Sequence, residues 1–148
     1  NYLDERLEYI RYTIDTISSH NNKNIIQARG PETLFTYSKY YPVIAQKDWD
    51  IEGELLDEFT ELKKYYSDIV VMLDFTLDEI RQRCAKDLKA RTNMSFWENL
   101  WFNYERSYFN GFSNLIRINN INWGVDECVE YIKKEIKEHY DKKSTESL

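Results

Sequence analysis

The first helical pattern in the chain lies over residues 3–19. Its apolar residues follow one another in steps of four, three, four and three, namely Leu3, Leu7, Ile10, Ile14 and Ile17. This spacing places them in one seam along a helix face. A seam this narrow is typical of a helix that packs into one groove of a bundle or coiled coil. Four charged residues lie away from the seam, namely Arg6, Glu8, Arg11 and Asp15.

A second helix is predicted over residues 31–45. Gly30 and Pro31 favour a helix start, and Glu32 stands where the N-terminal end of the helix dipole favours a carboxylate. Pro42 is expected to kink or stop this helix, because proline lacks the amide hydrogen that a helix interior needs. Trp49 follows in a loop, either packed down as a lid or exposed as a contact residue.

One long helix is predicted over residues 51–90, with Asp50 as its cap. Its apolar stripe continues for almost forty residues, through Ile51, Leu55, Phe59, Leu62, Tyr66, Ile69, Leu73, Leu77, Ile80, Cys84 and Leu88. Residues 76–79 read Thr-Leu-Asp-Glu, which matches the reciprocal capping pattern of a helix start. We favour a single helix with a kink near Phe75 over two separate helices.

A central, aromatic-rich helix is predicted over residues 95–118. It opens with a Ser95-x-x-Glu98 cap, and before Asn119 only Gly111 interrupts it. Apolar residues fall on nearly every side, which is typical of a helix buried in a bundle or in a dimer interface. A last helix is predicted over residues 125–140, followed by a polar tail, 141–148, that we expect to fray.

These elements predict an all-α fold, a single-domain bundle of about five helices spanning residues 1–148. The length of 148 residues is that of one domain with a sizeable core. Only 4 Gly and 2 Pro interrupt the chain, which favours long helices. No run of 18 apolar residues occurs, so we expect no membrane span.

The charge balance narrows the class of partner. The formal net charge is −6, and the basic residues are scattered among acids, whereas nucleic-acid binding needs clustered Lys and Arg. We therefore expect no nucleic-acid partner. Cys84 and Cys128 each fall in an apolar phase of a predicted helix, and two buried thiols are favoured over a disulfide. A reducing, cytoplasmic location is the expectation.

A group of carboxylates is the main candidate for metal chemistry. Glu54, Glu58, Glu61 and Asp68 share one side of the predicted long helix, and such a group could hold Mg²⁺. Residues 58–61, Glu-Phe-Thr-Glu, resemble the first E-x-x-E of the all-α NTP pyrophosphohydrolases, which implies a Mg-dependent nucleotide hydrolase. The second half of that motif departs, because Tyr65 stands where the acid before Asp68 belongs. We favour a solvated acidic face, with no metal and no cofactor.

A second resemblance lies near the end of the chain. Asn122-Trp123-Gly124, with Leu115 and Ile116 upstream, is similar to the N-W-G-R segment of Bcl-2-like proteins. Val125 replaces the arginine of that motif, so Trp123 is better interpreted as the anchor of a turn. His20 and His139 have no second ligand at metal-binding spacing. No catalytic residue is predicted.

The aromatic content carries the leading functional hypothesis. Aromatic residues make up 16% of the chain, with 12 Tyr and 4 Trp, and these residues are enriched at protein interfaces. We expect a non-enzymatic protein-binding bundle, acting as small inhibitors and immunity proteins do. The predicted partner or homodimer interface comprises Trp49, Trp97, Trp101, Phe102 and Phe109. The alternative is the ligand-binding and dimerisation domain of a regulator that lacks its DNA-binding part.

Overall fold

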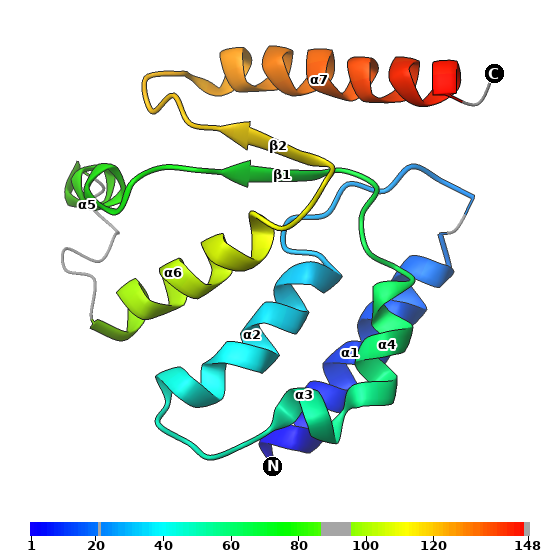
Figure 1. Cartoon of the computed structure of the whole chain (residues 1–148), viewed down its shortest axis with the longest axis vertical. Coiled ribbons are helices and arrows are strands. Elements are labelled where there is room, and N and C mark those ends of the chain that lie inside the picture. The colour runs from blue at the N-terminus through cyan, green and yellow to red at the C-terminus, as the bar shows by residue number, and fades with distance from the viewer. Residues whose placement is uncertain (21, 87–95, 147–148) are drawn as a thin grey trace. The chain divides into compact units, whose positions relative to one another are not determined.

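The computed structural model describes residues 1–20, 22–86 and 96–146, with the side chains of residues 84–86 and 96–101 outside the description. The described chain is mostly helical, as predicted, and it also contains two short strands (Figure 1). In chain order the elements are α1 (Tyr2–Ser18), α2 (Pro31–Ile44), α3 (Ile51–Glu54), α4 (Leu56–Lys63), β1 (Val70–Leu73), α5 (Leu77–Lys86), α6 (Phe96–Phe109), β2 (Leu115–Ile118) and α7 (Val125–Glu146).

The chain divides into two compact units. Unit 1 comprises Asn1–Asp68 and Phe96–Tyr108, and unit 2 comprises Ile69–Ser95 and Phe109–Leu148. Unit 1 therefore contains the first four helices and most of α6, whereas unit 2 contains both strands, α5 and α7. The single domain expected over residues 1–148 stays a prediction.

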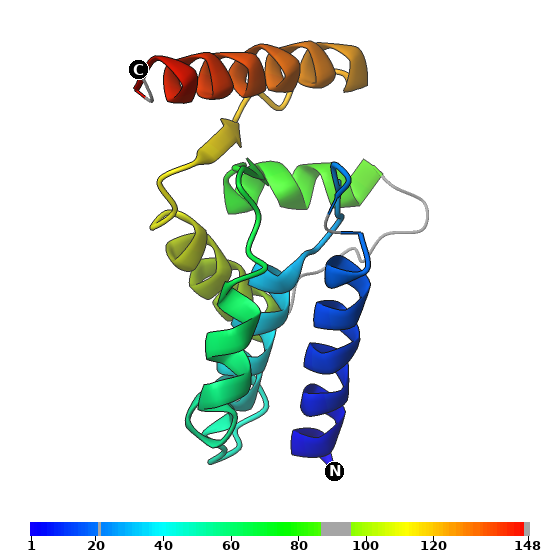
Figure 2. The same ribbon diagram turned by 90° about the vertical axis from the view of Figure 1, so that its right-hand side faces the viewer.

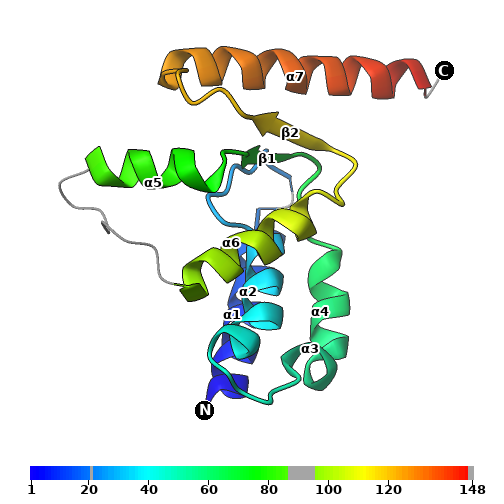
Figure 3. The ribbon, with the colours of Figure 1, turned by 60° about the vertical axis from the view of Figure 1, so that its left-hand side comes forward.

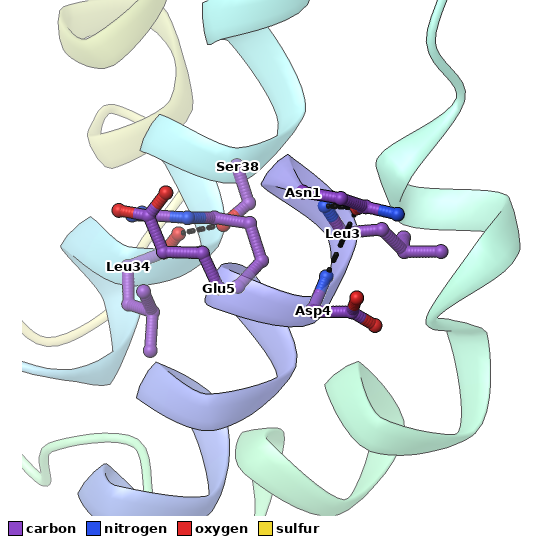
Figure 4. A network of polar contacts seen from close by, with 7 residues as sticks. Asn1, Leu3, Asp4, Glu5, Leu34 and Ser38 are labelled. Carbon is purple, nitrogen blue, oxygen red and sulfur yellow. Dashed lines mark hydrogen bonds and ion pairs between the residues drawn. The ribbon is translucent and has the colours of Figure 1, made fainter.

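Helix α1 begins at a side-chain cap. The Asn1 Oδ1 atom accepts hydrogen bonds from the backbone amides of Leu3 and Asp4 at 2.7 and 3.3 Å (Figure 4). These bonds satisfy two of the amide groups that a helix start leaves unpaired. Further along α2, the Ser38 hydroxyl donates to the Leu34 carbonyl at 2.8 Å, which satisfies that buried hydroxyl within its own helix.

The core of unit 1 lies among α1, α2, α3 and α4, and α1, α2 and α4 pack side by side (Figure 2). Its buried members are Ile10, Phe35, Ile51, Leu55, Phe59 and Leu62. Leu3, Leu7 and Ile14 pack against this cluster, so the predicted seam of the first helix is confirmed as a core-facing stripe. Among the described side chains, the buried members of this core come from residues 10–62, and Tyr108 of α6 packs against them.

The predicted helix over residues 51–90 is wrong as a continuous element. Helix α3 ends at Glu54, and Leu55 leaves helical geometry with φ −116° and ψ 36°. Helix α4 then ends at Lys63, and residues 70–73 form a strand. Ile69 and Leu73 matched the predicted helical stripe, but they belong to a contiguous apolar run, Ile69–Leu73. A short apolar run fits a buried helix and a buried strand equally well, so the stripe did not distinguish the two.

The Thr76–Glu79 cap is confirmed. The Glu79 amide donates to the Thr76 hydroxyl at 3.2 Å, and the Thr76 amide donates to the Glu79 carboxylate at 3.1 Å. This pair starts a separate helix, α5, rather than a kinked continuation. The Asp50 cap is confirmed as well, because its carboxylate accepts from the Gly53 amide at 2.9 Å.

The predicted helix over residues 95–118 is wrong in its second half. Helix α6 ends at Phe109, a turn follows at Asn110 and Gly111, and residues 115–118 form β2. Leu115, Ile116 and Ile118 give a dense apolar segment that fits a strand as well as a helix. Pairing with β1, far away in sequence, decides the outcome.

The two strands of unit 2 pair in parallel. Val70 lies beside Leu115, and Leu73 lies beside Ile118. Helix α7 runs along β2 (Figure 3). It continues to Glu146, so residues 141–146, which were expected to fray, are helical, while 147–148 lie outside the described residues.

Candidate functional site

A buried arginine stands at the centre of the most distinctive site in unit 1. Arg6 on α1 is 8% exposed, although it lies away from the apolar seam of that helix. Its guanidinium carbon lies 5.0 Å from the ring centroid of Tyr2, 4.7 Å from that of Tyr9 and 5.2 Å from that of Tyr37. These are cation–π distances, and burial strengthens the attraction. The surrounding aromatic rings therefore stabilise the guanidinium charge in its buried position.

The same rings continue as a stack across three segments. The Tyr2 ring stacks on Tyr41 at 5.1 Å and on Trp49 at 5.2 Å, and the Tyr37 ring stacks on Tyr41 at 5.2 Å. The stack thus joins α1, α2 and the loop that follows α2. We call this set the Arg6 cluster, and its members are Tyr2, Arg6, Tyr9, Tyr37, Tyr41 and Trp49.

The outer members of the Arg6 cluster face solvent. Tyr9 is 50% exposed, Trp49 is 43% exposed and Tyr37 is 38% exposed. Exposed tyrosine and tryptophan around an arginine match the residue types that dominate binding energy at protein interfaces. The cluster therefore has the composition of a contact surface, with rigid rings outside and a fixed charge beneath them.

The electrostatics of the Arg6 cluster keep its phenols neutral. Burial raises the pKa of Tyr2 and of Tyr37, and the Arg6 guanidinium only partly offsets this. The Glu5 carboxylate lies 3.3 Å from the Arg6 guanidinium and balances its charge. Within the described residues, the Tyr2 hydroxyl and the Arg6 Nε atom are buried without a hydrogen-bond partner. Unsatisfied buried groups of this kind are uncommon in folded proteins.

Charged residues of both signs lie near the Arg6 cluster. Glu5 pairs with Arg6, Asp48 and Asp50 flank Trp49 in the chain, and the Lys47 Nζ atom lies 5.8 Å from the Trp49 ring centroid. The excess of acid belongs to unit 1 as a whole, which contains 15 Asp and Glu against 9 Lys and Arg. The net negative charge of unit 1 favours a partner with basic side chains.

A second polar group in unit 1 is structural in character. The Glu32 side chain, which is 3% exposed on α2, accepts a hydrogen bond from the Ser67 amide. A side chain on Gly30 would place its Cβ 2.9 Å from the same Glu32 carboxylate, so glycine suits this position. Nearby, the Tyr66 and Tyr108 hydroxyls lie 3.0 Å apart, and burial raises the pKa of both phenols.

A third polar group lies at the carboxyl end of β1 in unit 2. The Arg117 guanidinium lies 3.1 Å from the Asp74 carboxylate and also donates to the Asn110 side chain. Asp74 directly follows β1 and its side chain is 10% exposed. In open parallel α/β sheets, ligands bind outside the carboxyl ends of the strands. The capped N-terminus of α5 begins at the same end.

The predicted interface residues differ in their location and in their exposure. Trp49 belongs to the Arg6 cluster and is exposed, as one of its two predicted roles requires. Phe102 is half-buried, with the Arg106 guanidinium 5.9 Å from its ring. Phe109 is 8% exposed and stacks on Phe112 within unit 2, and its role in an interface stays a prediction. The side chains of Trp97 and Trp101 lie outside the described residues.

The four predicted carboxylates do not gather into a metal site. Glu54 ends α3, Glu58 and Glu61 lie on α4, and Asp68 follows α4 outside any helix. Glu61 forms an ion pair with Lys64 at 2.7 Å. Across the described parts of the chain, no three His, Cys, Asp or Glu side chains are placed to hold a metal ion. The break at Leu55 removes the shared face that a single helix would have given them.

Sequence reasoning missed Arg6 and the tyrosines around it. A usable signal existed in the spacing, because Tyr2, Arg6 and Tyr9 are separated by four and three residues, and Tyr37 and Tyr41 by four. Residues at this spacing share one helix face. Only the packing of α2 on α1 shows that the two aromatic faces meet over the arginine.

Comparison of the chain with models of protein families, with curated proteins and with solved structures gives no match. Among the described residues, none of the helices combines the length and the apolar character needed to cross a membrane. The functional conclusion therefore rests on the geometry of the Arg6 cluster.

Proposed function

We propose that this protein is a non-enzymatic protein-binding domain that docks a partner through the Arg6 cluster. The supporting observation is a buried arginine held beneath three tyrosine rings, with Tyr9 and Trp49 exposed above it. Tyrosine, tryptophan and arginine are the usual hot-spot residues of protein interfaces. The rings are rigid and already stacked, so little side-chain entropy is lost when a partner binds.

The partner in this proposal presents basic side chains around an apolar centre. Exposed tyrosine and tryptophan rings attract Lys and Arg through cation–π contacts. Asp48 and Asp50, on either side of Trp49 in the chain, add attraction for basic groups. The proposal thus keeps the action of an inhibitor or immunity-type protein, which blocks a basic surface. The homodimer is a separate proposal.

The test is quantitative capture from the native host with three forms of the protein as bait. The wild type and Tyr140→Ala should retain the same partner, because Tyr140 is equally exposed at 47% but lies on α7. The double variant Tyr9→Ala with Trp49→Ala should lose it at least tenfold. The affinity of the purified pair should also fall as salt is raised, since rim charges are screened.

Two outcomes would overturn the proposal. One is equal retention by the wild type and by the double variant. The other is a purified partner that binds the Tyr140→Ala variant as weakly as it binds the double variant. That result would mean that loss of any exposed aromatic side chain weakens binding, whether or not it belongs to the Arg6 cluster.

A second candidate function rests on the parallel strands of unit 2. Asp74, the Arg117 guanidinium and the capped start of α5 lie at the carboxyl end of β1, where α/β sheets bind ligands. The Arg117 side chain is 40% exposed, and a guanidinium is a group that binds phosphate, so this candidate ligand is a phosphorylated small molecule such as a nucleotide. Nucleoside monophosphates and triphosphates with Mg²⁺ should then raise the melting temperature of the wild type but not of Arg117→Gln. No rise with any of them contradicts this candidate.

A further inference from the structure

The two-stranded sheet of unit 2 has an open edge at β1. Within the part of the chain that the structure describes, β1 pairs with β2 alone. The Val70 amide donates to the Asn114 carbonyl at 3.0 Å, and the Asp74 amide donates to the Ile118 carbonyl at 2.8 Å. Backbone groups of alternate residues in a strand point to opposite edges, so those of Val71 and Leu73 point to the open edge. This edge is a template for another strand.

One face of the sheet is covered over β2 but not over β1. The register places Val71 beside Ile116 and Leu73 beside Ile118 on the same face. Ile116 and Ile118 are 7% and 1% exposed, whereas Val71 and Leu73 are 41% and 60% exposed. The apolar face therefore continues from a buried strand onto an exposed one, and it stops where the next strand would begin.

Apart from its shortness, four residues, β1 carries none of the sequence features that normally protect an edge strand. Residues 69–73 read Ile-Val-Val-Met-Leu, without charge, proline or glycine. Parallel strands are usually buried inside a larger sheet, and an isolated two-stranded pair is marginal in water. These features indicate that β1 is an internal strand of a larger sheet.

The charge distribution favours a second copy of this chain as the source of the next strand. Unit 1 carries the whole excess of acid, whereas unit 2 contains 11 Asp and Glu against 11 Lys and Arg. Two copies can therefore bring their β1 edges together without the like-charge repulsion that unit 1 would impose. An uncharged apolar edge is also complementary to itself, which an isologous contact requires.

We propose that two copies of this protein join through β1 in an antiparallel pair with twofold symmetry centred on Met72. In this register the outward backbone groups of Val71 meet those of Leu73 from the second copy, in the closely bonded pairs of an antiparallel ladder. The Val71 and Leu73 side chains of both copies then gather on one face, beside Ile116 and Ile118. The product is a continuous four-stranded sheet. This inference is independent of the proposed function, which uses unit 1.

Light scattering at micromolar concentration gives the first test. The chain has a mass of 18.0 kDa, so the proposal predicts a species of about 36 kDa, twice that mass. The variant Val71→Lys with Leu73→Lys should shift the protein to the monomer, because two lysines from each copy would meet in the interface. The control is Leu56→Lys, which changes an apolar side chain that is 58% exposed on α4 and should leave the dimer intact.

A crosslink tests the register without a disruptive charge. In a Cys84→Ser and Cys128→Ser background, Met72→Cys places two thiols across the twofold axis, where opposed Cα atoms lie about 4.5 Å apart, within the span of a disulfide. Val71→Cys is the matched control, since its two copies lie diagonally at about 7–8 Å. Oxidation should link Met72→Cys at least tenfold faster than Val71→Cys.

The proposal is overturned by a wild-type mass of 18.0 kDa at every concentration up to 100 times the first. It is equally overturned by a dimer that survives the paired lysine substitutions, or by equal crosslinking of the two cysteine variants. The first result would assign the β1 edge to a strand from a different polypeptide segment. Any of the three leaves the test of the Arg6 cluster unaffected.

Discussion

The hydroxyl oxygens of Tyr66 and Tyr108 lie 3.0 Å apart and join the segment after α4 to α6 within unit 1. The two residues are 42 positions apart in the chain, and both rings border the core of the first four helices. This contact ties α6 to the core of the first four helices.

The Tyr66–Tyr108 contact gives the first prediction. Tyr108→Phe keeps the ring packing and removes one hydroxyl, so it should lower the free energy of unfolding by about 0.5–1.5 kcal/mol, the usual net value of one hydrogen bond. Urea denaturation measures the change, and Tyr140→Phe on the exposed face of α7 is the control. Equal effects of the two substitutions would mean that the contact contributes nothing specific.

Alkaline pH should destabilise unit 1. Burial raises the pKa of Tyr2, Tyr37, Tyr66 and Tyr108 above the ordinary phenol value of 10.0. The folded state therefore holds these protons more tightly than the unfolded state. The stability that they contribute is complete below pH 10.0 and is lost as the pH rises above it.

Absorbance at 295 nm, recorded with circular dichroism during a pH titration, measures this effect. We expect the exposed tyrosines to ionise first and the buried set to ionise only as the helix signal falls. If all 12 tyrosines ionise in one step while the helix signal is unchanged, the buried phenols are not protected by the fold.

Removing the buried charge should weaken the packing of α1 on α2. Arg6→Met keeps an unbranched side chain beneath the rings but loses the cation–π attraction, which is worth about 1–2 kcal/mol in a desolvated site. Arg11→Met is the matched control, because Arg11 is exposed on the same helix. A loss for Arg6→Met no larger than that for Arg11→Met in urea would show that the rings gain nothing from the charge.

The buried leucine of α4 should be the costliest aliphatic side chain to truncate in unit 1. Leu62 is 0% exposed, and Leu62→Ala should cost about 2–5 kcal/mol through lost burial and a residual cavity. Leu56→Ala, six residues earlier on the same helix and 58% exposed, should cost less than about 0.5 kcal/mol. A mild effect of Leu62→Ala would place the core elsewhere.

The two units should unfold together if the chain is one domain, as its length predicts. Ile118 on β2 is 1% exposed in unit 2, so Ile118→Ala and Leu62→Ala probe different units. Both should shift the same single thermal transition, because a two-state domain has one transition for all probes. Two separated transitions, each moved by one of the substitutions, would establish two independent domains.

Local sequence determined the helices and caps that depend on interactions between residues a few positions apart. The seam from Leu3 to Ile17 predicts a helix over 3–19, and α1 covers Tyr2–Ser18. Pro31 and Glu32 start α2 where the sequence places them, although Pro42 lies inside the helix and does not stop it. The caps at Asp50 and Thr76 form as predicted, since a cap joins residues only three positions apart.

Tertiary structure alone decided the strands and the candidate site. The segments at 70–73 and 115–118 satisfy a helical stripe and a buried strand equally, and their pairing across 45 positions of the chain settles the choice. Trp49 was singled out by its residue type, but its ring contacts depend on where α1 and α2 meet. Arg6 lies away from the apolar seam of α1, and a helical wheel of α1 does not show the neighbouring helix. Tyr2 and Tyr9 of the same helix contact its guanidinium, but the third ring, Tyr37, comes from α2, and that contact is not encoded by local sequence.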